Sequence, residues 1–167
     1  PRGRTLGVTS ILPEEDRHNY TRQQLLNTLV YVMGGRAAEE VKFRDFTTGA
    51  ANDLQRATEL AHKMVCEWGM SPRLGPRTFG EPTGQVFLGK DIGRERQFSE
   101  ETASLIDAEV QELLTKAYEK SLDTLRTQSD LLERVSAALL ERETLDGEEL
   151  DVLIRGETLP PLYNARS

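Results

Sequence analysis

The chain has 167 residues and a mass of 18.8 kDa, which is the usual size of one domain. Its 37% hydrophobic and 29% charged residues are typical of a folded, helix-rich domain. The 28 acidic residues outnumber the 21 basic ones, and the net charge of -7 argues against nucleic-acid binding, which depends on a basic face. No apolar run reaches the roughly 18 residues of a membrane span, and Cys66 alone cannot form an internal disulfide. We therefore exclude secreted, fibrous, disordered and membrane-spanning classes, and because the sequence begins at Pro1 we expect a piece of a longer chain.

The N-terminal residues contain the strand candidate of this sequence. Leu6, Val8 and Leu12 stand on alternate positions of residues 4–12, with β-branched residues between them. No second strand pattern lies beside it, and a lone strand is unstable in water. The strand, expected over residues 5–11, therefore pairs with chain outside this sequence, packs on helices, or accepts a partner peptide.

The next two elements are predicted helices. Thr21 and Gln24 form a capping box, and apolar residues then recur at helical spacing as far as Ala37. The Gly34-Gly35 pair within this pattern indicates either a helix break or the close approach of another backbone. A second helix is expected from about Ala50 to Trp68. Its apolar stripe comprises Leu54, Ala57, Ala61, Met64, Val65 and Trp68.

The C-terminal half of the chain predicts a long loop and three more helices. Glycine and proline punctuate residues 70–97, which form an unusually long connection for a compact domain. Ser99 caps a long helix, a further helix spans about 130–143, and Asp146 with Glu149 caps a short last helix. Residues 157–167 form an irregular tail. The prediction is a mainly α helical bundle, a single domain over residues 1–167, with one short edge strand and one long loop.

Carboxylates are the candidates for chemistry. The sequence has only two histidines, His18 and His62, and no phosphate loop, CxxC pair or nucleophile elbow. Asp53 lies in the first turn of its helix and stacks with the apolar residues Ala57 and Met64. An inward charge is costly unless it is paired or bound to a metal, but a half-exposed carboxylate at a helix N-terminus is also common. Both interpretations remain open from the spacing alone.

Glu39 and Glu40 form a second unusual feature. On a helical wheel Glu40 falls near the middle of the apolar stripe and Glu39 at its edge. The pair is either solvated beyond the last buried turn or placed there for a function.

Several ordered segments resemble one family, the ATP-dependent zinc metallopeptidases of the FtsH type. The resemblance covers nearly the whole chain. It runs through PRGRTLGVT (1–9), GGRAAEE (34–40), TTGAANDLQRAT (47–58), CEWGMSPRLGP (66–76), VFLG (86–89), SEETASLIDAEV (99–110) and ERETLDGEEL (141–150). It implies a C-terminal peptidase domain of mainly helical fold, with the N-terminal strand as the edge that binds substrate.

The resemblance also implies roles for individual residues. Asp53 matches the aspartate that supplies the third zinc ligand, and Glu39 matches a glutamate near the active site that orients a ligating histidine. The helical wheel favours Glu40 for such a place, so the choice between the two glutamates stays open. The family's HExxH motif, which holds two zinc-binding histidines and the general base, is absent from these 167 residues. We expect it just upstream, so this piece contains no catalytic base and is expected to be inactive alone.

The resulting functional expectation concerns the parent protein. It is a membrane-anchored, ATP-dependent zinc metalloprotease that degrades unfolded or tagged proteins inside a homo-hexameric ring, with no nucleic-acid partner. Zn²⁺ belongs to the peptidase site, whereas ATP and Mg²⁺ belong to a separate AAA module. The expected location is the cytosolic side of a bacterial cytoplasmic membrane, in preference to an organelle inner membrane or thylakoid. The alternatives are a catalytically inactive helical assembly module and a degenerate relative that acts as a scaffold.

Overall fold

The computed structural model describes residues 19–79 and 98–161, and every regular element in these ranges is helical. The elements are α1 (Arg22–Val32), α2 (Gly34–Phe43), the 3₁₀ turn η1 (Thr48–Ala50), α3 (Ala51–Cys66), α4 (Glu100–Thr127), α5 (Ser129–Arg142) and α6 (Gly147–Ile154). The predicted mainly α class is confirmed. The predicted edge strand, His18 and residues 80–97 of the predicted loop lie outside the described residues.

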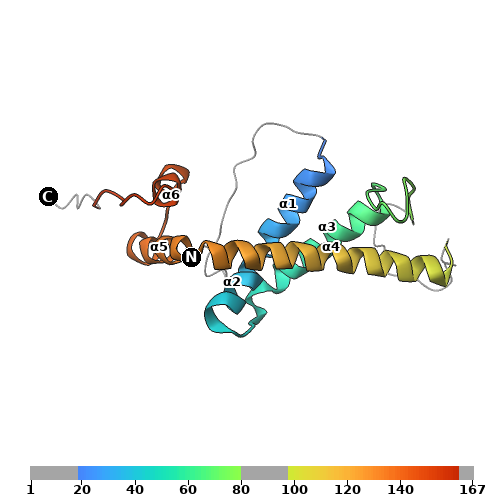
Figure 1. The fold of residues 1–167 in the computed structure, drawn as a ribbon, viewed down its shortest axis with the longest axis horizontal. Helices are drawn as coiled ribbons and strands as arrows, with labels where there is room; N and C mark the ends of the chain where they lie inside the picture. The colour runs from blue at the N-terminus through green and yellow to red at the C-terminus, as the bar shows by residue number, and fades with distance from the viewer. Residues whose placement is uncertain (1–18, 80–97, 162–167) are drawn as a thin grey trace, which may run out of the picture.

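Helix α4 is the central helix, on which the other long helices pack. Helices α1, α2 and α3 all pack against it, and α1 also packs against α3 (Figure 1). Helices α5 and α6 pack on each other beyond the C-terminal end of α4. None of the helices in the described ranges is long and apolar enough to cross a membrane.

The helix starts follow the capping residues that the sequence predicts. At α1, the Thr21 amide donates to Gln24 Oε1 at 2.8 Å, and the Thr21 hydroxyl accepts from the Gln24 amide. At α4, Ser99 Oγ accepts from an amide of the first turn, and at α6 the Asp146 carboxylate forms the second capping box. Each cap satisfies amides that have no partner within the helix.

Of the two effects predicted for the Gly34-Gly35 pair, the structure shows the helix break, and no backbone atom of another described segment approaches either glycine closely. The helix is interrupted at Met33, where α1 ends and α2 begins, although the Met33 amide still reaches the Leu29 carbonyl at 3.0 Å. A Cβ atom at Gly34 would lie 4.0 Å from Ser121 Oγ of α4. At that distance the Cβ atom would make only an ordinary van der Waals contact, so the packing of α2 on α4 does not require a glycine here.

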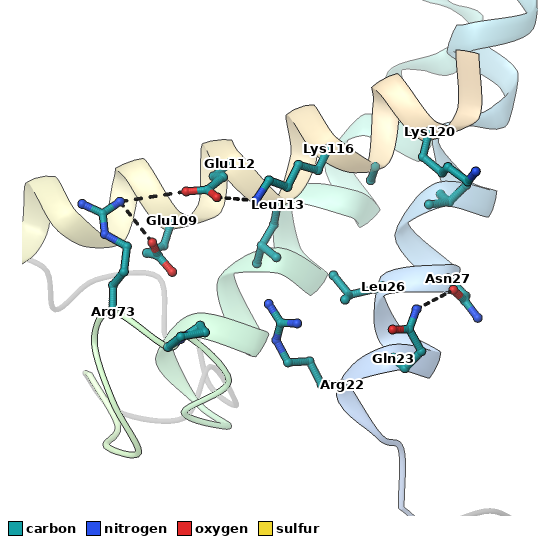
Figure 2. Close-up of a pocket in the computed structure, with 13 residues that line it drawn as sticks. Arg22, Gln23, Leu26, Asn27, Arg73, Glu109, Glu112, Leu113, Lys116 and Lys120 are labelled. Atoms are coloured by element: carbon teal, nitrogen blue, oxygen red, sulfur yellow. Dashed lines mark hydrogen bonds and ion pairs between the residues drawn. The ribbon is translucent and has the colours of Figure 1, made fainter. Parts of the chain in front are cut away.

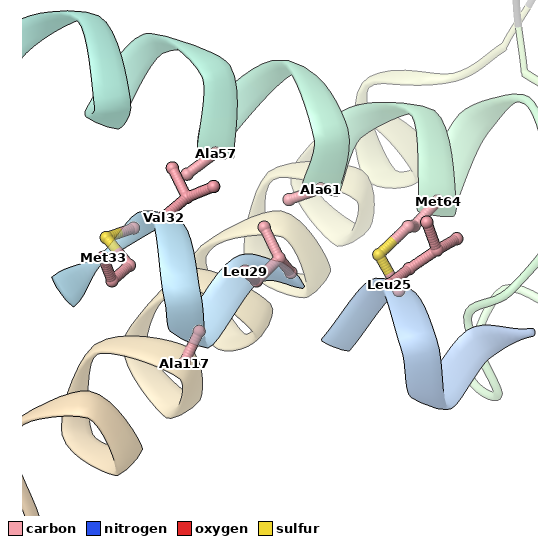
Figure 3. Packing of buried hydrophobic residues seen from close by; sticks show 8 residues of the cluster. All are labelled: Leu25, Leu29, Val32, Met33, Ala57, Ala61, Met64 and Ala117. Atoms are coloured by element: carbon pink, nitrogen blue, oxygen red, sulfur yellow. The ribbon is translucent and has the colours of Figure 1, made fainter. Parts of the chain in front are cut away.

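The core forms where α1, α3 and α4 meet (Figure 3). Leu29 and Met64 are fully buried, and Ala57, Ala61 and Ala117 let the helices pack closely around them. The predicted stripe of the second helix was wrong at its two ends. Trp68 is 45% exposed because it lies beyond the end of α3, and Leu54 is 36% exposed at the other end of the helix.

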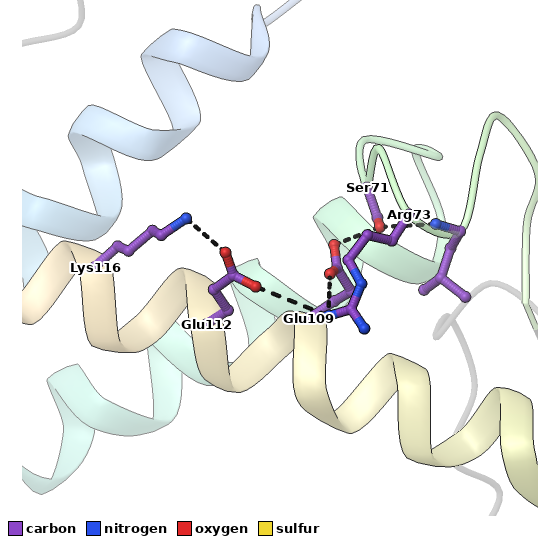
Figure 4. A network of polar contacts seen from close by, with 6 residues as sticks. Ser71, Arg73, Glu109, Glu112 and Lys116 are labelled. Carbon is purple, nitrogen blue, oxygen red and sulfur yellow. Dashed lines mark hydrogen bonds and ion pairs between the residues drawn. The ribbon is translucent and has the colours of Figure 1, made fainter.

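A buried polar cluster attaches the loop after α3 to α4 (Figure 4). Ser71 Oγ donates to one oxygen of Glu109 at 2.5 Å, and Arg73 contacts the other oxygen at 3.2 Å. Glu109 is only 7% exposed, so these partners compensate the cost of burying its charge. The loop is further fixed by the Phe79 amide, which donates to the Cys66 carbonyl at 2.8 Å.

The packing predicts unequal costs for two leucine truncations. Leu29→Ala should lower the free energy of unfolding by about 2–5 kcal/mol, because Leu29 is fully buried among three helices. Leu140→Ala should change it by less than about 0.5 kcal/mol, because this side chain is 87% exposed. Urea denaturation of both variants measures the difference, and equal losses would contradict the assigned core.

Candidate functional site

Asp53 lies half-buried in the first turn of α3, where the partial positive charge of the helix N-terminus favours a carboxylate. None of the described residues makes a hydrogen bond or an ion pair with this carboxylate. Its Oδ2 lies against α2, only 3.5 Å from where a Cβ atom of Gly35 would be. Gly35 itself is exposed, and Asp53 is half-buried beside it.

The turn that leads into α3 is held by Glu39 of α2. The two Glu39 oxygens accept from the two donors of Thr47, the hydroxyl at 2.5 Å and the amide at 3.1 Å. The Thr47 hydroxyl also accepts from the Gly49 amide at 3.0 Å, which caps η1. Thr47 was not among the predicted site residues, although a threonine just before a glycine-containing turn is a recognisable capping signal.

These hydrogen bonds change the acidity of Glu39. The Thr47 hydroxyl, and then its amide, stabilise the ionised carboxylate and hold the Glu39 pKa below its ordinary value of 4.5. The guanidinium of Arg36 adds to this effect, and Arg36 also stacks on the ring of Phe46 at 3.4 Å from its centroid. The ionised Glu39 carboxylate is therefore favoured, and both of its oxygens already accept hydrogen bonds from Thr47.

Glu40 faces a different neighbour. It accepts a hydrogen bond from the Tyr118 hydroxyl at 2.5 Å and contacts Arg126 at 3.3 Å, both on α4. Burial and the Glu40 carboxylate together raise the pKa of Tyr118 to about 12. Glu40 thus attaches α2 to α4, whereas Glu39 attaches α2 to the turn that precedes Asp53.

The described residues offer only part of a metal site. They contain no group of three histidine, cysteine or acidic side chains placed to hold a metal ion. Cys66 Sγ lies 3.7 Å from His62 Nε2, but Cys66 is buried and burial raises the pKa of its thiol, which disfavours the thiolate that binds metals. Asp53 suits a cation better. Carboxylate oxygens are common zinc ligands, and no described residue forms a hydrogen bond or an ion pair with this one.

A groove lies elsewhere among the described residues (Figure 2). It has a volume of about 600 Å³ between α1, α4 and the loop after α3. Its charges serve the fold: Arg73 pairs with Glu109, Lys116 pairs with Glu112, and Arg22 donates to the Met70 carbonyl. It includes neither Asp53 nor Glu39, and we assign it no chemistry.

Comparison with known proteins identifies the family. The model of "Peptidase family M41" matches residues 1–153, which include Glu39, Thr47 and Asp53. The chain belongs to peptidase family M41.

Members of the family with curated descriptions are similar over nearly all of this chain. The chain is 52% identical to the "ATP-dependent zinc metalloprotease FtsH" of Acidobacterium capsulatum, over 97% of this chain and 25% of that protein. It is 49% identical to the protein of the same name from Thermotoga maritima, over 94% of this chain and 26% of that protein. The chain is 47% identical to the protein of the same name from Myxococcus xanthus, over 99% of this chain and 27% of that protein. The chain thus spans about a quarter of the length of these bacterial M41 relatives.

The Glu39–Thr47 contact predicts a measurable pH effect. A carboxyl whose pKa is lowered on folding stabilises the fold above its unfolded-state pKa, and this contribution is lost as the pH falls through the folded-state value. NMR titration should therefore find the Glu39 pKa below 4.5. Thr47→Val removes the hydroxyl donor, and should raise the Glu39 pKa towards its ordinary value and reduce the loss of thermal stability below that pH. An unchanged Glu39 pKa in Thr47→Val would contradict this contact.

Proposed function

We propose that this chain is the peptidase domain, over residues 1–167, of an ATP-dependent zinc metalloprotease. Membership of peptidase family M41 and the names of its relatives support this assignment. The observation that carries it is the Asp53 carboxylate, which is half-buried, lies at a helix N-terminus and is free of any described partner. By contrast, the carboxylates of Glu39, Glu40 and Glu109 accept hydrogen bonds from described residues.

In this proposal Asp53 supplies one ligand of the zinc ion. When bound, zinc acts as a Lewis acid on the scissile peptide carbonyl and makes water nucleophilic near neutral pH. The partial positive charge of the helix N-terminus favours the Asp53 carboxylate. The two histidine ligands and the general-base glutamate come from an HExxH segment outside this sequence.

The rest of the proposed activity belongs to the longer protein. A separate AAA module uses ATP and Mg²⁺ to deliver protein substrates, and six copies form a ring around the peptidase sites. Segments outside this sequence anchor the protein at a bacterial cytoplasmic membrane, with the peptidase domain facing the cytosol. The bacterial relatives are each about four times as long as this match, which leaves room for further modules, and their names state that they depend on ATP.

A purely structural role is the alternative, and one observation favours it. Leu140 is 87% exposed and Ile154 60% exposed on the paired helices α5 and α6, where an assembly contact would bury them. An assembly role alone does not account for the match to peptidase family M41 or for the names of the relatives. We therefore favour the peptidase, in which assembly and zinc binding act together.

The ligand assignment predicts a selective loss. In the intact protein, Asp53→Asn should abolish proteolysis and weaken zinc binding by more than the roughly 10–100-fold that changes outside the ligand sphere cost. ATP hydrolysis should continue, because its site is on another module. The matched control is Asp130→Asn, which removes the exposed first-turn carboxylate of α5. Peptidase, ATPase and zinc-content assays test both variants, and normal proteolysis in Asp53→Asn would reject the assignment.

A further inference from the structure

Helices α2 and α3 hardly touch each other directly, although Asp53 lies against α2. Each helix packs mainly on α4 instead, and α3 also packs on α1. Packing alone therefore fixes the middle of α3 better than its first turn, where Asp53 stands. Something else must set the position of that carboxylate relative to α2.

The Glu39–Thr47 pair forms that link. Each Glu39 oxygen accepts one hydrogen bond from Thr47, one oxygen from the amide and the other from the hydroxyl. This two-point contact fixes the direction as well as the distance between the two residues. Thr47 in turn caps η1, which continues without interruption into α3 at Ala51. Glu39 is thus connected to Asp53 by its hydrogen bonds to Thr47 and by the short helical segment from η1 into α3.

The backbone of the turn is equally constrained. A Cβ atom at Gly49 would lie 3.1 Å from Thr47 Oγ1 and 3.4 Å from Glu39 Oε1, so a side chain there would push the pair apart. Gly35 and Glu39 are four residues apart and share one face of α2. That face therefore meets both the cap of η1 and the carboxylate of Asp53.

We propose that Glu39 and Thr47 are positioning residues that set the placement of the Asp53 carboxylate for zinc through the η1 turn. This inference rests on the proposed role of Asp53 as a ligand. It also assigns the two glutamates different tasks, because Glu40 accepts its hydrogen bonds from Tyr118 and Arg126 of α4, whereas Glu39 accepts from Thr47. Glu39 acts on the segment that leads to Asp53.

The test uses the intact protein and two substitutions at one position. Thr47→Val keeps the shape of the side chain but removes the hydroxyl, whereas Thr47→Ser keeps the hydroxyl. Zinc affinity is measured by competition with a chromophoric chelator, and the metal geometry by the visible absorption of the cobalt(II)-substituted protein. Thr47→Val should weaken zinc binding by about 10–100-fold and alter the cobalt spectrum. Thr47→Ser should stay close to the wild type in both readouts.

Two further variants separate positioning from general destabilisation. Glu39→Gln should reproduce the effect of Thr47→Val, because an amide cannot accept at both positions from the two Thr47 donors. Glu40→Gln breaks the contacts with Tyr118 and Arg126 and should lower the melting temperature while leaving zinc affinity and the cobalt spectrum unchanged. A similar loss of affinity in Glu39→Gln and Glu40→Gln would overturn the inference.

The remaining outcomes distinguish this inference from the proposed function. Wild-type zinc affinity in Asp53→Asn rejects the ligand role, and the inference with it. Lost affinity in Asp53→Asn, together with wild-type affinity and spectrum in Thr47→Val, overturns the positioning role alone. Equal losses in Thr47→Val and Thr47→Ser would also overturn it, since the hydroxyl would then be irrelevant.

Discussion

Close packing of three helices on α4 is the constraint on which the rest of this structure depends. Helices approach closely only where their facing side chains are small, and Ala57, Ala61 and Ala117 stand at these points around the buried Leu29. Glu109 of α4 also fixes the loop after α3, because it contacts Ser71 and Arg73 of that loop. A single long helix thus organises every segment near the candidate site.

The same packing explains why the candidate site needs polar links of its own. Helices that meet on a third helix leave their ends less constrained than their centres, and Asp53 stands at such an end. In this chain Glu39 of α2 accepts two hydrogen bonds from Thr47, the residue that caps the η1 turn before α3. A ligand must be held to a fraction of an ångström, and directional hydrogen bonds provide this better than hydrophobic contact.

Much of the fold could be predicted from the sequence, because helix starts and helix faces depend on residues that are close together in the chain. Capping boxes at Thr21 and Asp146 and the apolar spacing place the helices to within a few residues. Trp68 was misplaced because periodicity does not show where a helix ends. Asp53 could be singled out by its inward position, but its lack of a partner could not, since that depends on all its spatial neighbours. The different tasks of Glu39 and Glu40 were also beyond the helical wheel, because Thr47 and Tyr118 come from other segments.

The central claim is that Asp53 binds zinc within a frame set by α2 and α4. The most direct test is a crystal structure of the intact zinc-loaded protein, with anomalous diffraction data collected on both sides of the zinc absorption edge. The account predicts an anomalous peak at about 2.0–2.2 Å from a carboxylate oxygen of Asp53. A fully occupied zinc site whose ligands exclude Asp53 would contradict it.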